Sequence, residues 1–331
     1  MVNLLPLYER ERAAGRALAV CILLETAGST YSKAGSLLLI AQSGEYAGLL
    51  SGGCLEGDLA ERVRRVVETG QPETVAYDMR GPDDLLWGLG SGCEGAMQVL
   101  MIRCGPQNDW QPLAALRDAL AEHRPLCVGV DVASGAVHTA LPPRTTPGYV
   151  AGPGGRRLFA LPLELPPRVL ILGGGPDAVP VIEFAARLGF KLTVYDHRPA
   201  YAQAARFPLA ESVQCAPAPA LARQLVLDHY EAAVVMSHHL PSDLDYLRAL
   251  AHSRVPFIGL LGPAPRRDRL RHELGADAAL LGARLHAPVG LALGGRSSPA
   301  IALAIVAELQ AWFSGTQGGP FSRAVQQRTS A

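Results

Sequence analysis

The sequence has no excess of charge of either sign, and this limits the classes of partner. Its 331 residues contain 30 basic and 30 acidic side chains, so the formal net charge is zero. Lysine is scarce among the basic residues, since Lys33 and Lys191 are the only two. Nucleic acids and anionic membrane surfaces both favour a strong basic excess. We therefore expect neither a nucleic acid nor a membrane as the main partner.

Segments that would direct the chain to or through a membrane are also lacking. Residues 1–12 contain no basic stretch followed by an apolar one, so we expect no signal peptide. No apolar run approaches the roughly 18 residues that are needed to span a bilayer. The six cysteines form no Cys-x-x-Cys pair and no dense framework. This usage predicts reduced thiols in a cytoplasmic protein.

The length of the chain and its element pattern predict about two domains. We expect an α+β domain over residues 1–110 and a Rossmann-type domain with a C-terminal helix over residues 167–315. Prolines and glycines gather between residues 142 and 155, which predicts a bridging region and linker over residues 111–166. The polar tail over residues 316–331 is expected to be disordered.

The first half has the pattern of an α+β fold. Apolar residues at helical spacing predict helices, and short apolar or alternating runs predict strands. The expected helices cover residues 3–15, 54–68 and 109–123, and the expected strands cover residues 18–25, 36–41, 46–50, 74–77, 96–103 and 126–132.

The second half alternates strands with helices. Such alternation predicts a doubly wound parallel sheet, and hence an α/β class for the chain. The expected strands cover residues 168–172, 191–195, 232–236 and 257–260, and the expected helices cover residues 178–188, 243–252, 265–274 and 299–313.

A glycine loop, Gly173-Gly174-Gly175, follows the first of these strands. With Ala178 it completes the pattern G-x-G-x-x-A between a strand and a helix, which is typical of dinucleotide-binding sites. Asp196 ends the next strand, where a carboxylate meets ribose hydroxyls. The pattern predicts a nucleotide or phosphate ligand. The alternative is a Rossmann fold used only as a scaffold, which Asp177 favours because its charge opposes a pyrophosphate.

A histidine follows the strand over residues 232–236. His238 lies where the carboxyl ends of parallel strands bind ligands, so it is a candidate proton donor or phosphate contact. The alternative is a surface-loop histidine without a role. Ser237 and Asp243 lie nearby, but no segment resembles a nucleophile elbow.

Two cysteines occupy glycine-rich loops in the first half. Cys54 in Ser51-Gly-Gly-Cys-Leu-Glu-Gly57 precedes a predicted helix, whose dipole favours the thiolate. Cys93 lies in Gly90-Ser-Gly-Cys-Glu-Gly95. Two soft thiolates suit a soft metal, a sulfur atom in transit or a disulfide with each other. The alternative is a pair of turn cysteines without a role. The other four cysteines are expected to pack or to be incidental.

Several segments together resemble the XdhC/CoxI family, the accessory proteins of xanthine dehydrogenase-type molybdenum hydroxylases. The resemblance rests on their order and spacing along most of the chain. The segments are Gly28-Ser-Thr-Tyr-Ser-Lys-Ala-Gly35, Ser51-Gly-Gly-Cys-Leu-Glu56, Tyr77-Asp78, Trp87-Gly-Leu-Gly-Ser-Gly-Cys-Glu-Gly95, Val234-Val-Met-Ser-His238, Phe257-Ile-Gly-Leu-Leu-Gly-Pro263 and Ala287-Pro-Val-Gly-Leu291.

The resemblance implies a protein that binds and protects the molybdenum cofactor (molybdopterin, with or without a nucleotide extension). It implies delivery of the sulfurated cofactor to an apo molybdenum hydroxylase, with a cysteine desulfurase as the second partner. A homodimer is the default expectation. The implied cofactor-binding residues are Ser51, Gly52, Gly53, Cys54, Glu56, Cys93, Glu94, Gly173, Gly174, Gly175, Asp196 and His238.

Within that set, Cys54 and Cys93 are the candidate contacts to molybdenum or sulfur. No catalytic residue is assigned, and the candidates for one are Cys54, Cys93 and His238. The residues favour a chaperone over an enzyme, with assistance to sulfuration left open. A cleft between the two domains, with the glycine loop on one wall and the two thiols on the other, is the expected location of the cofactor.

The sequence departs from the family pattern near its end. Ala292 and Ala300 stand where the family often carries acidic residues. Whatever those carboxylates do elsewhere, this chain does differently or not at all.

Three other functions stay open at this stage. The glycine loop and Asp196 also suit an NAD(P)-dependent oxidoreductase, although no proton donor with a substrate clamp is evident. Cys54 and Cys93 suit a thiol or persulfide-transfer protein. A scaffold that bridges a hydroxylase and a desulfurase without holding cofactor is the last of these hypotheses.

Overall fold

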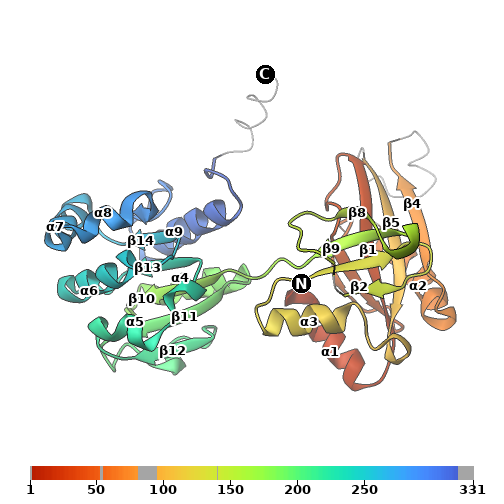
Figure 1. The fold of residues 1–331 in the computed structure, drawn as a ribbon, viewed down its shortest axis with the longest axis horizontal. Helices are drawn as coiled ribbons and strands as arrows, with labels where there is room; N and C mark the ends of the chain where they lie inside the picture. The colour runs from red at the N-terminus through yellow and green to blue at the C-terminus, as the bar shows by residue number, and fades with distance from the viewer. Residues whose placement is uncertain (1, 53–54, 81–94, 140, 320–331) are drawn as a thin grey trace, which may run out of the picture. The chain divides into compact units, whose positions relative to one another are not determined.

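The structure, a computed structural model, describes residues 2–52, 55–80, 95–139 and 141–319. The chain divides into two compact units, Met1–Leu165 and Pro166–Ala331 (Figure 1). Among the described residues, none of the helices combines the length and apolar character that crossing a bilayer requires.

The first unit contains an antiparallel sheet in the strand order β3-β2-β1-β5-β4. Leu18 to Leu24 of β1 are buried without interruption, because both faces of this sheet are covered. Helix α2 packs on one face, where Leu59 and Val63 join the core beneath β1. The elements are α1 (Leu5–Ala13), β1 (Leu18–Gly28), β2 (Leu37–Ala41), β3 (Tyr46–Gly48), α2 (Glu56–Thr69), β4 (Glu73–Asp78) and β5 (Gly95–Cys104).

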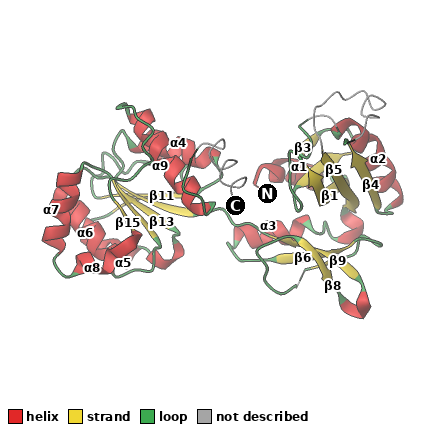
Figure 2. Cartoon of the chain, turned by 90° about the horizontal axis from the view of Figure 1, so that it is seen from above, coloured by secondary structure: helices red, strands yellow, loops and turns green. Residues whose placement is uncertain are grey.

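A second antiparallel sheet, in the order β7-β6-β9-β8, covers the other face (Figure 2). Val130 and Phe159 of this sheet share one core with Val20 and Ile22 of β1. The segment expected to be a bridge and linker is therefore a layer of the first unit. Its elements are α3 (Leu113–Ala121), β6 (Cys127–Asp131), β7 (Val137–His138), β8 (Gly148–Ala151) and β9 (Arg157–Pro162).

The second unit contains a six-stranded sheet in the order β12-β11-β10-β13-β14-β15, with every pair parallel. Chain order reverses between β10 and β13, as it does at the centre of a Rossmann fold. The structure thus confirms the predicted α/β class. The strands are β10 (Arg168–Leu172), β11 (Lys191–Asp196), β12 (Ser212–Cys215), β13 (Ala232–Val235), β14 (Phe257–Leu260) and β15 (Leu285–His286).

Helices cover both faces of the parallel sheet. Helices α4 and α9 share one core, and α5, α6, α7 and α8 share the other (Figure 1). The predicted start of α6 at residue 243 was wrong. The helix begins at Leu240, and Pro241 is tolerated there because a first helical turn does not need its N–H group. The helices are α4 (Ala178–Arg187), α5 (Leu221–Gln224), α6 (Leu240–Ala251), α7 (Ala264–Leu274), α8 (Asp277–Leu281) and α9 (Ser298–Phe313).

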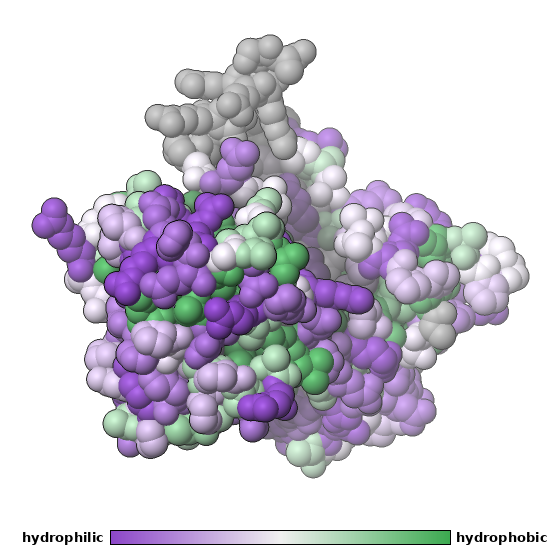
Figure 3. Space-filling view, turned by 60° about the vertical axis from the view of Figure 1, so that its left-hand side comes forward, coloured by the Kyte–Doolittle hydropathy of each residue, from purple (hydrophilic) through white to green (hydrophobic). Residues whose placement is uncertain are grey.

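The surface carries scattered apolar side chains. On the face drawn in Figure 3, hydrophobic residues lie in small patches that hydrophilic residues interrupt. Such scattered exposure is ordinary for a folded protein, and it becomes informative only where an exposed ring adjoins other functional features.

Candidate functional site

Two of the glycine segments meet at one end of the first sheet. Gly28, which ends β1, pairs with Gly95, which begins β5. A Cβ atom at residue 95 would overlap the carbonyl oxygen of Ser29 and lie 2.7 Å from Cγ2 of Thr30. Only glycine fits there, so the end of the second cysteine segment abuts the loop that follows β1.

The first cysteine segment reaches the same place. The Ser32 hydroxyl donates to the Leu49 carbonyl at 3.0 Å, which ties the loop after β1 to the residues before Ser51. An ideal Cβ on Gly52 would lie 3.8 Å from Cδ2 of Tyr31. Three segments that are far apart in the sequence, residues 28–35, 49–52 and the start of β5, are therefore neighbours in the first unit.

Glu56 organises the segment around the first cysteine. The residue is 3% exposed, and its carboxylate accepts hydrogen bonds from the backbone N–H groups of Leu50 and Ser51 at 3.2 and 3.1 Å. The Ser51 hydroxyl donates to it at 2.6 Å, and the Leu55 N–H donates at 3.1 Å. The carboxylate therefore holds the backbone on both sides of residues 53 and 54.

These contacts change the acidity of Glu56. Burial by itself would raise its pKa, but the hydrogen bonds from Ser51 and the surrounding backbone outweigh burial and hold the pKa below its ordinary value. The side chain is thus an anion whose acceptors face the loop. Glu56 was predicted to bind the cofactor. In the structure its carboxylate binds the backbone N–H groups of Leu50, Ser51 and Leu55.

The Tyr77-Asp78 segment also has a structural task. The Tyr77 hydroxyl donates to Asp58 at 2.5 Å, and Asp58 in turn accepts from Arg62 at 2.8 Å. Arg62 also reaches Glu73 of β4 at 2.8 Å. This network fastens α2, which begins at Glu56, to the edge strand β4.

The other predicted residues of the cysteine loops lie outside the described residues. They are Gly53, Cys54, Cys93 and Glu94. The roles predicted for the two thiols remain predictions. Three of the remaining cysteines, Cys21, Cys104 and Cys127, are buried, and burial raises the pKa of each thiol. Since the thiolate is the reactive form, these three are unsuited to sulfur chemistry.

In the second unit, Gly173 lets two loops approach closely. It has φ +126°, and a Cβ there would lie 2.5 Å from the backbone nitrogen of Ser237 and 2.6 Å from the carbonyl of Met236. The loop after β10 therefore packs directly on the end of β13. The first glycine of the fingerprint serves this contact between strands.

Asp196, the last residue of β11, lies at the carboxyl ends of the parallel strands and is fully buried. It accepts from the Gly174 N–H at 2.7 Å, from the Arg198 N–H at 2.8 Å, and from Nε and Nη2 of the Arg198 guanidinium at 2.9 and 2.7 Å. Burial alone would raise its pKa, but these bonds outweigh burial and lower it. Four donors leave the carboxylate little capacity for ribose hydroxyls.

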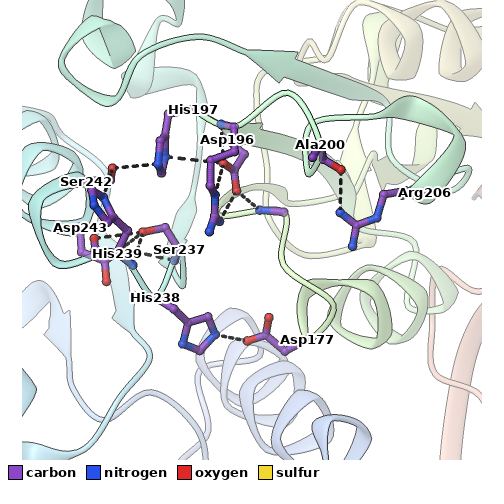
Figure 4. A network of polar contacts seen from close by, with 12 residues as sticks. Asp177, Asp196, His197, Ala200, Arg206, Ser237, His238, His239, Ser242 and Asp243 are labelled. Atoms are coloured by element: carbon purple, nitrogen blue, oxygen red, sulfur yellow. Dashed lines mark hydrogen bonds and ion pairs between the residues drawn. The ribbon is translucent and has the colours of Figure 1, made fainter.

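Asp177 and His238 form another acid–base pair, at the point between β10 and β13 where the strand order reverses. Oδ2 of Asp177, the residue before α4, lies 2.7 Å from Nε2 of His238 (Figure 4). His238 has φ +60°, an uncommon backbone conformation for a residue with a side chain. The pair joins the loop after β10 to the loop after β13. Asp177 makes no capping hydrogen bond to α4.

Further polar groups fill the rest of this edge. Asp243 is fully buried, accepts from the Ser237 hydroxyl and pairs with Arg266 at 2.6 Å. The Ser242 hydroxyl lies between Nδ1 of His239 at 2.9 Å and Nε2 of His197 at 3.4 Å (Figure 4). No group of three His, Cys, Asp or Glu residues within the described ranges has the arrangement of a metal site.

These residues do not fit a dinucleotide in the usual Rossmann manner. The Asp196 carboxylate, which would accept from ribose hydroxyls, accepts from Arg198 and from the Gly174 N–H. The carboxylate of Asp177 lies beside the N-terminus of α4, which would face a phosphate. The polar groups at the carboxyl ends of these strands bond to one another.

Sequence-family models match both units. The model described as the XdhC and CoxI family matches residues 11–78, and the model described as the XdhC Rossmann domain matches residues 169–309. The chain belongs to the XdhC and CoxI family. The resemblance inferred from the motifs is confirmed.

Relatives of this XdhC-family chain match it over nearly its whole length. A Bacillus subtilis (strain 168) protein, named as a probable xanthine dehydrogenase subunit, is 29% identical over 314 residues, which are 87% of this chain and 90% of that protein. An Escherichia coli (strain K12) protein named "Molybdenum cofactor insertion chaperone PaoD" is 24% identical over 302 residues, covering 89% of this chain and 83% of that protein.

A solved structure is also similar. The crystal structure of a xanthine dehydrogenase from Bacillus halodurans matches with a TM-score of 0.80 and 29% identity, covering 96% of this chain and 98% of that one. The likeness therefore extends over both units of the XdhC-family fold.

Sequence reasoning missed several residues of this XdhC-family protein. Arg198, two residues after Asp196, was not assigned to the site, although an arginine in that position is a ready partner for the carboxylate. The sequence motif contains Tyr31 and Ser32 but predicted no separate role for either residue. The backbone N–H of Ala300 donates to the Ser297 hydroxyl at 3.4 Å, which caps the start of α9.

Proposed function

We propose that this protein is an accessory protein that binds and protects the sulfurated molybdenum cofactor and inserts it into a xanthine dehydrogenase-type molybdenum hydroxylase. The observation that carries the proposal is the match over 89% of the chain to a protein named as a molybdenum cofactor insertion chaperone. The relative named for xanthine dehydrogenase supports a role in the maturation of that class of enzyme.

The cofactor is cargo in this proposal, and the first unit supplies the residues that suit it. Residues 28–35, the segment before Cys54 and the start of β5 after Cys93 converge, and glycines at the contacts keep the backbone open. Glu56 binds the backbone N–H groups of Leu50 and Leu55, which precede and follow Cys54 in the sequence. Soft thiolates suit molybdenum or its sulfido ligand.

The second unit is proposed to supply fewer cofactor ligands than the first. In its glycine loop the Gly174 N–H donates to Asp196. Between the loops after β10 and β13, Asp177 pairs with His238. These contacts weigh against the NAD(P)-dependent oxidoreductase as the alternative function. Thiol or persulfide transfer through Cys54 and Cys93 stays compatible with the proposal, since sulfuration needs a sulfur carrier.

The test is direct loading of the protein. Purified protein is incubated anaerobically with cofactor released from a molybdenum hydroxylase, and bound molybdenum and pterin are measured after gel filtration. We expect near-stoichiometric retention by the wild type and weaker retention by Cys54→Ala and Cys93→Ala. Cys215→Ala, which removes an exposed thiol of the second unit, is the matched control and should retain cofactor like the wild type.

Two results would count against the proposal. Absence of retained molybdenum and pterin in the wild type would overturn cofactor carriage. Wild-type retention in both cysteine variants would remove the thiols from it. Activation of an apo hydroxylase by the loaded protein, with or without a cysteine desulfurase, then tests insertion and the two proposed partners.

A further inference from the structure

Tyr31 is the most exposed large hydrophobic side chain among the described residues. Its exposed fraction is 67%, and it lies in the loop between β1 and β2. An aromatic ring left in water forgoes the stabilisation that burial would give it. A ring in this position is therefore available for contact with another molecule.

The loop holds the backbone around Tyr31 on both sides. The Thr30 hydroxyl donates to the Ser32 carbonyl at 2.9 Å, and the Ser32 hydroxyl donates to Leu49 at 3.0 Å. Farther along, the Gly35 N–H donates to the Leu23 carbonyl at 2.7 Å. The ring is thus presented from an anchored loop, which lowers the entropy that binding would cost.

The neighbour of the ring is a glycine of the first cysteine segment. Gly52 has φ +76°, and an ideal Cβ there would be 3.8 Å from the Tyr31 ring. A larger residue at 52 would have side-chain atoms beyond that Cβ, against the ring. The absence of such a side chain leaves the ring accessible immediately beside the segment that contains Cys54.

The same loop carries a positive charge. Lys33 is exposed, and no ion pair joins it to an acidic residue within the described part of the chain. It is one of only two lysines in the sequence, the other being Lys191 of the second unit. A ring with a cation two residues away suits a ligand that is planar and carries an anionic group.

We propose that Tyr31 is the stacking platform for the planar pterin ring of the cargo, with Lys33 facing its phosphate. This proposal rests on the proposed function and deepens it by naming which part of the cofactor the loop after β1 receives. Stacking on a tyrosine requires only a flat π-system, so the platform also predicts affinity for a pterin without molybdenum.

The experiment uses the full chain and two metal-free probes, 6-hydroxymethylpterin and its phosphate ester. Quenching of pterin fluorescence gives the dissociation constant for wild type, Tyr31→Phe, Tyr31→Ala and Lys33→Gln. We expect Tyr31→Ala to weaken binding of both probes about tenfold, and Tyr31→Phe to stay within about twofold of wild type. Lys33→Gln should weaken only the phosphate ester.

Tyr46→Ala is the matched control. Tyr46 is 48% exposed on β3 of the same sheet, and its loss should leave both dissociation constants unchanged. Thermal unfolding of each variant verifies that the exposed substitutions leave the fold intact.

The outcomes separate this proposal from the proposed function. Equal pterin affinity in wild type and Tyr31→Ala overturns the platform, even if the wild type retains molybdenum cofactor. Tyr31-dependent pterin binding without retention of molybdenum cofactor supports the platform and overturns cofactor carriage. Absence of binding by the wild type to both pterins and to the cofactor overturns both.

Discussion

At the scale of single residues, charges that a sequence pattern assigns to a ligand are paired within this protein. Asp196 occupies the position of a ribose-binding acid, yet it accepts from Gly174 and three times from Arg198. Asp177 opposes a phosphate by its charge and is joined to His238. The fingerprint identified the location of these residues, but it contains no information on whether a neighbouring side chain has already taken their hydrogen-bonding capacity.

The paired state of Asp196 predicts how stability depends on pH. Its pKa in the folded protein is below the value of 3.8 that an unperturbed aspartate has, so ionised Asp196 stabilises the fold above about pH 4 and loses that contribution as pH falls through the folded pKa. Asp196→Asn should therefore destabilise the protein at neutral pH. The difference in unfolding free energy between the two proteins should shrink as pH falls below about 4.

Urea unfolding of wild type and Asp196→Asn over a series of pH values measures this difference. A difference that stays constant over the whole series would contradict the assignment. Arg198→Gln is the complementary variant, because it removes the guanidinium and leaves the buried carboxylate with the backbone N–H groups of Gly174 and Arg198 as donors. It should cost about 1–3 kcal/mol of unfolding free energy at neutral pH.

At the scale of elements, the segment between β3 and α2 depends on one carboxylate. Glu56 accepts from the backbone N–H groups of Leu50, Ser51 and Leu55, three residues that lie outside helices and strands. The motif Ser-Gly-Gly-Cys-Leu-Glu thus contains both a cysteine and the carboxylate that binds the backbone at Leu50, Ser51 and Leu55.

Substitution of Glu56 should loosen that segment. Glu56→Gln keeps the size of the side chain but removes the charge, and we expect a loss of about 1–3 kcal/mol of unfolding free energy. Hydrogen exchange followed by mass spectrometry should show faster exchange at Leu50, Ser51 and Leu55 than in the wild type. Unchanged exchange at those amides would refute the clamp.

Glu61→Gln on the same helix is the control for that experiment. The Glu61 side chain is 71% exposed and pairs with Arg64 three residues on. Surface pairs of this kind contribute about 0–1 kcal/mol, so this variant should keep wild-type exchange in the loop.

Most elements followed from periodicity, and the exceptions have physical causes. The strands around residues 168–172 and 257–260 are buried apolar runs, and the structure has them at the predicted bounds. β12 and β15 were not predicted, because an edge strand of four half-exposed residues and a strand of two carry little hydrophobic signal. β8 and β9 were hidden by the prolines and glycines around them, although Leu158 to Leu161 of β9 form a buried run that could have indicated a strand.

At the scale of the whole molecule, each unit contains its own cores. The parallel sheet is buried between two layers of helices, and the first antiparallel sheet is buried between α2 and a second sheet. Units of this size with separate cores are expected to fold independently. The boundary lies between Leu165 and Pro166.

Separate expression of the two units tests that independence. We expect residues 1–165 and residues 166–331 each to unfold in a single cooperative thermal transition followed by circular dichroism. If residues 166–331 were unfolded on their own, the parallel-sheet unit would depend on contacts with the first.

The sequence by itself determined the α/β class, the alternation of strands and helices in the second half and the family, because these follow from periodicity and from local motifs in a fixed order. Only the tertiary structure decided which partners the polar residues take. It brought Tyr31 to Gly52, Gly95 to Ser29 and Arg198 to Asp196 as neighbours. Such contacts depend on how strands pair and how loops pack, and neither is encoded in the spacing of residues along one segment.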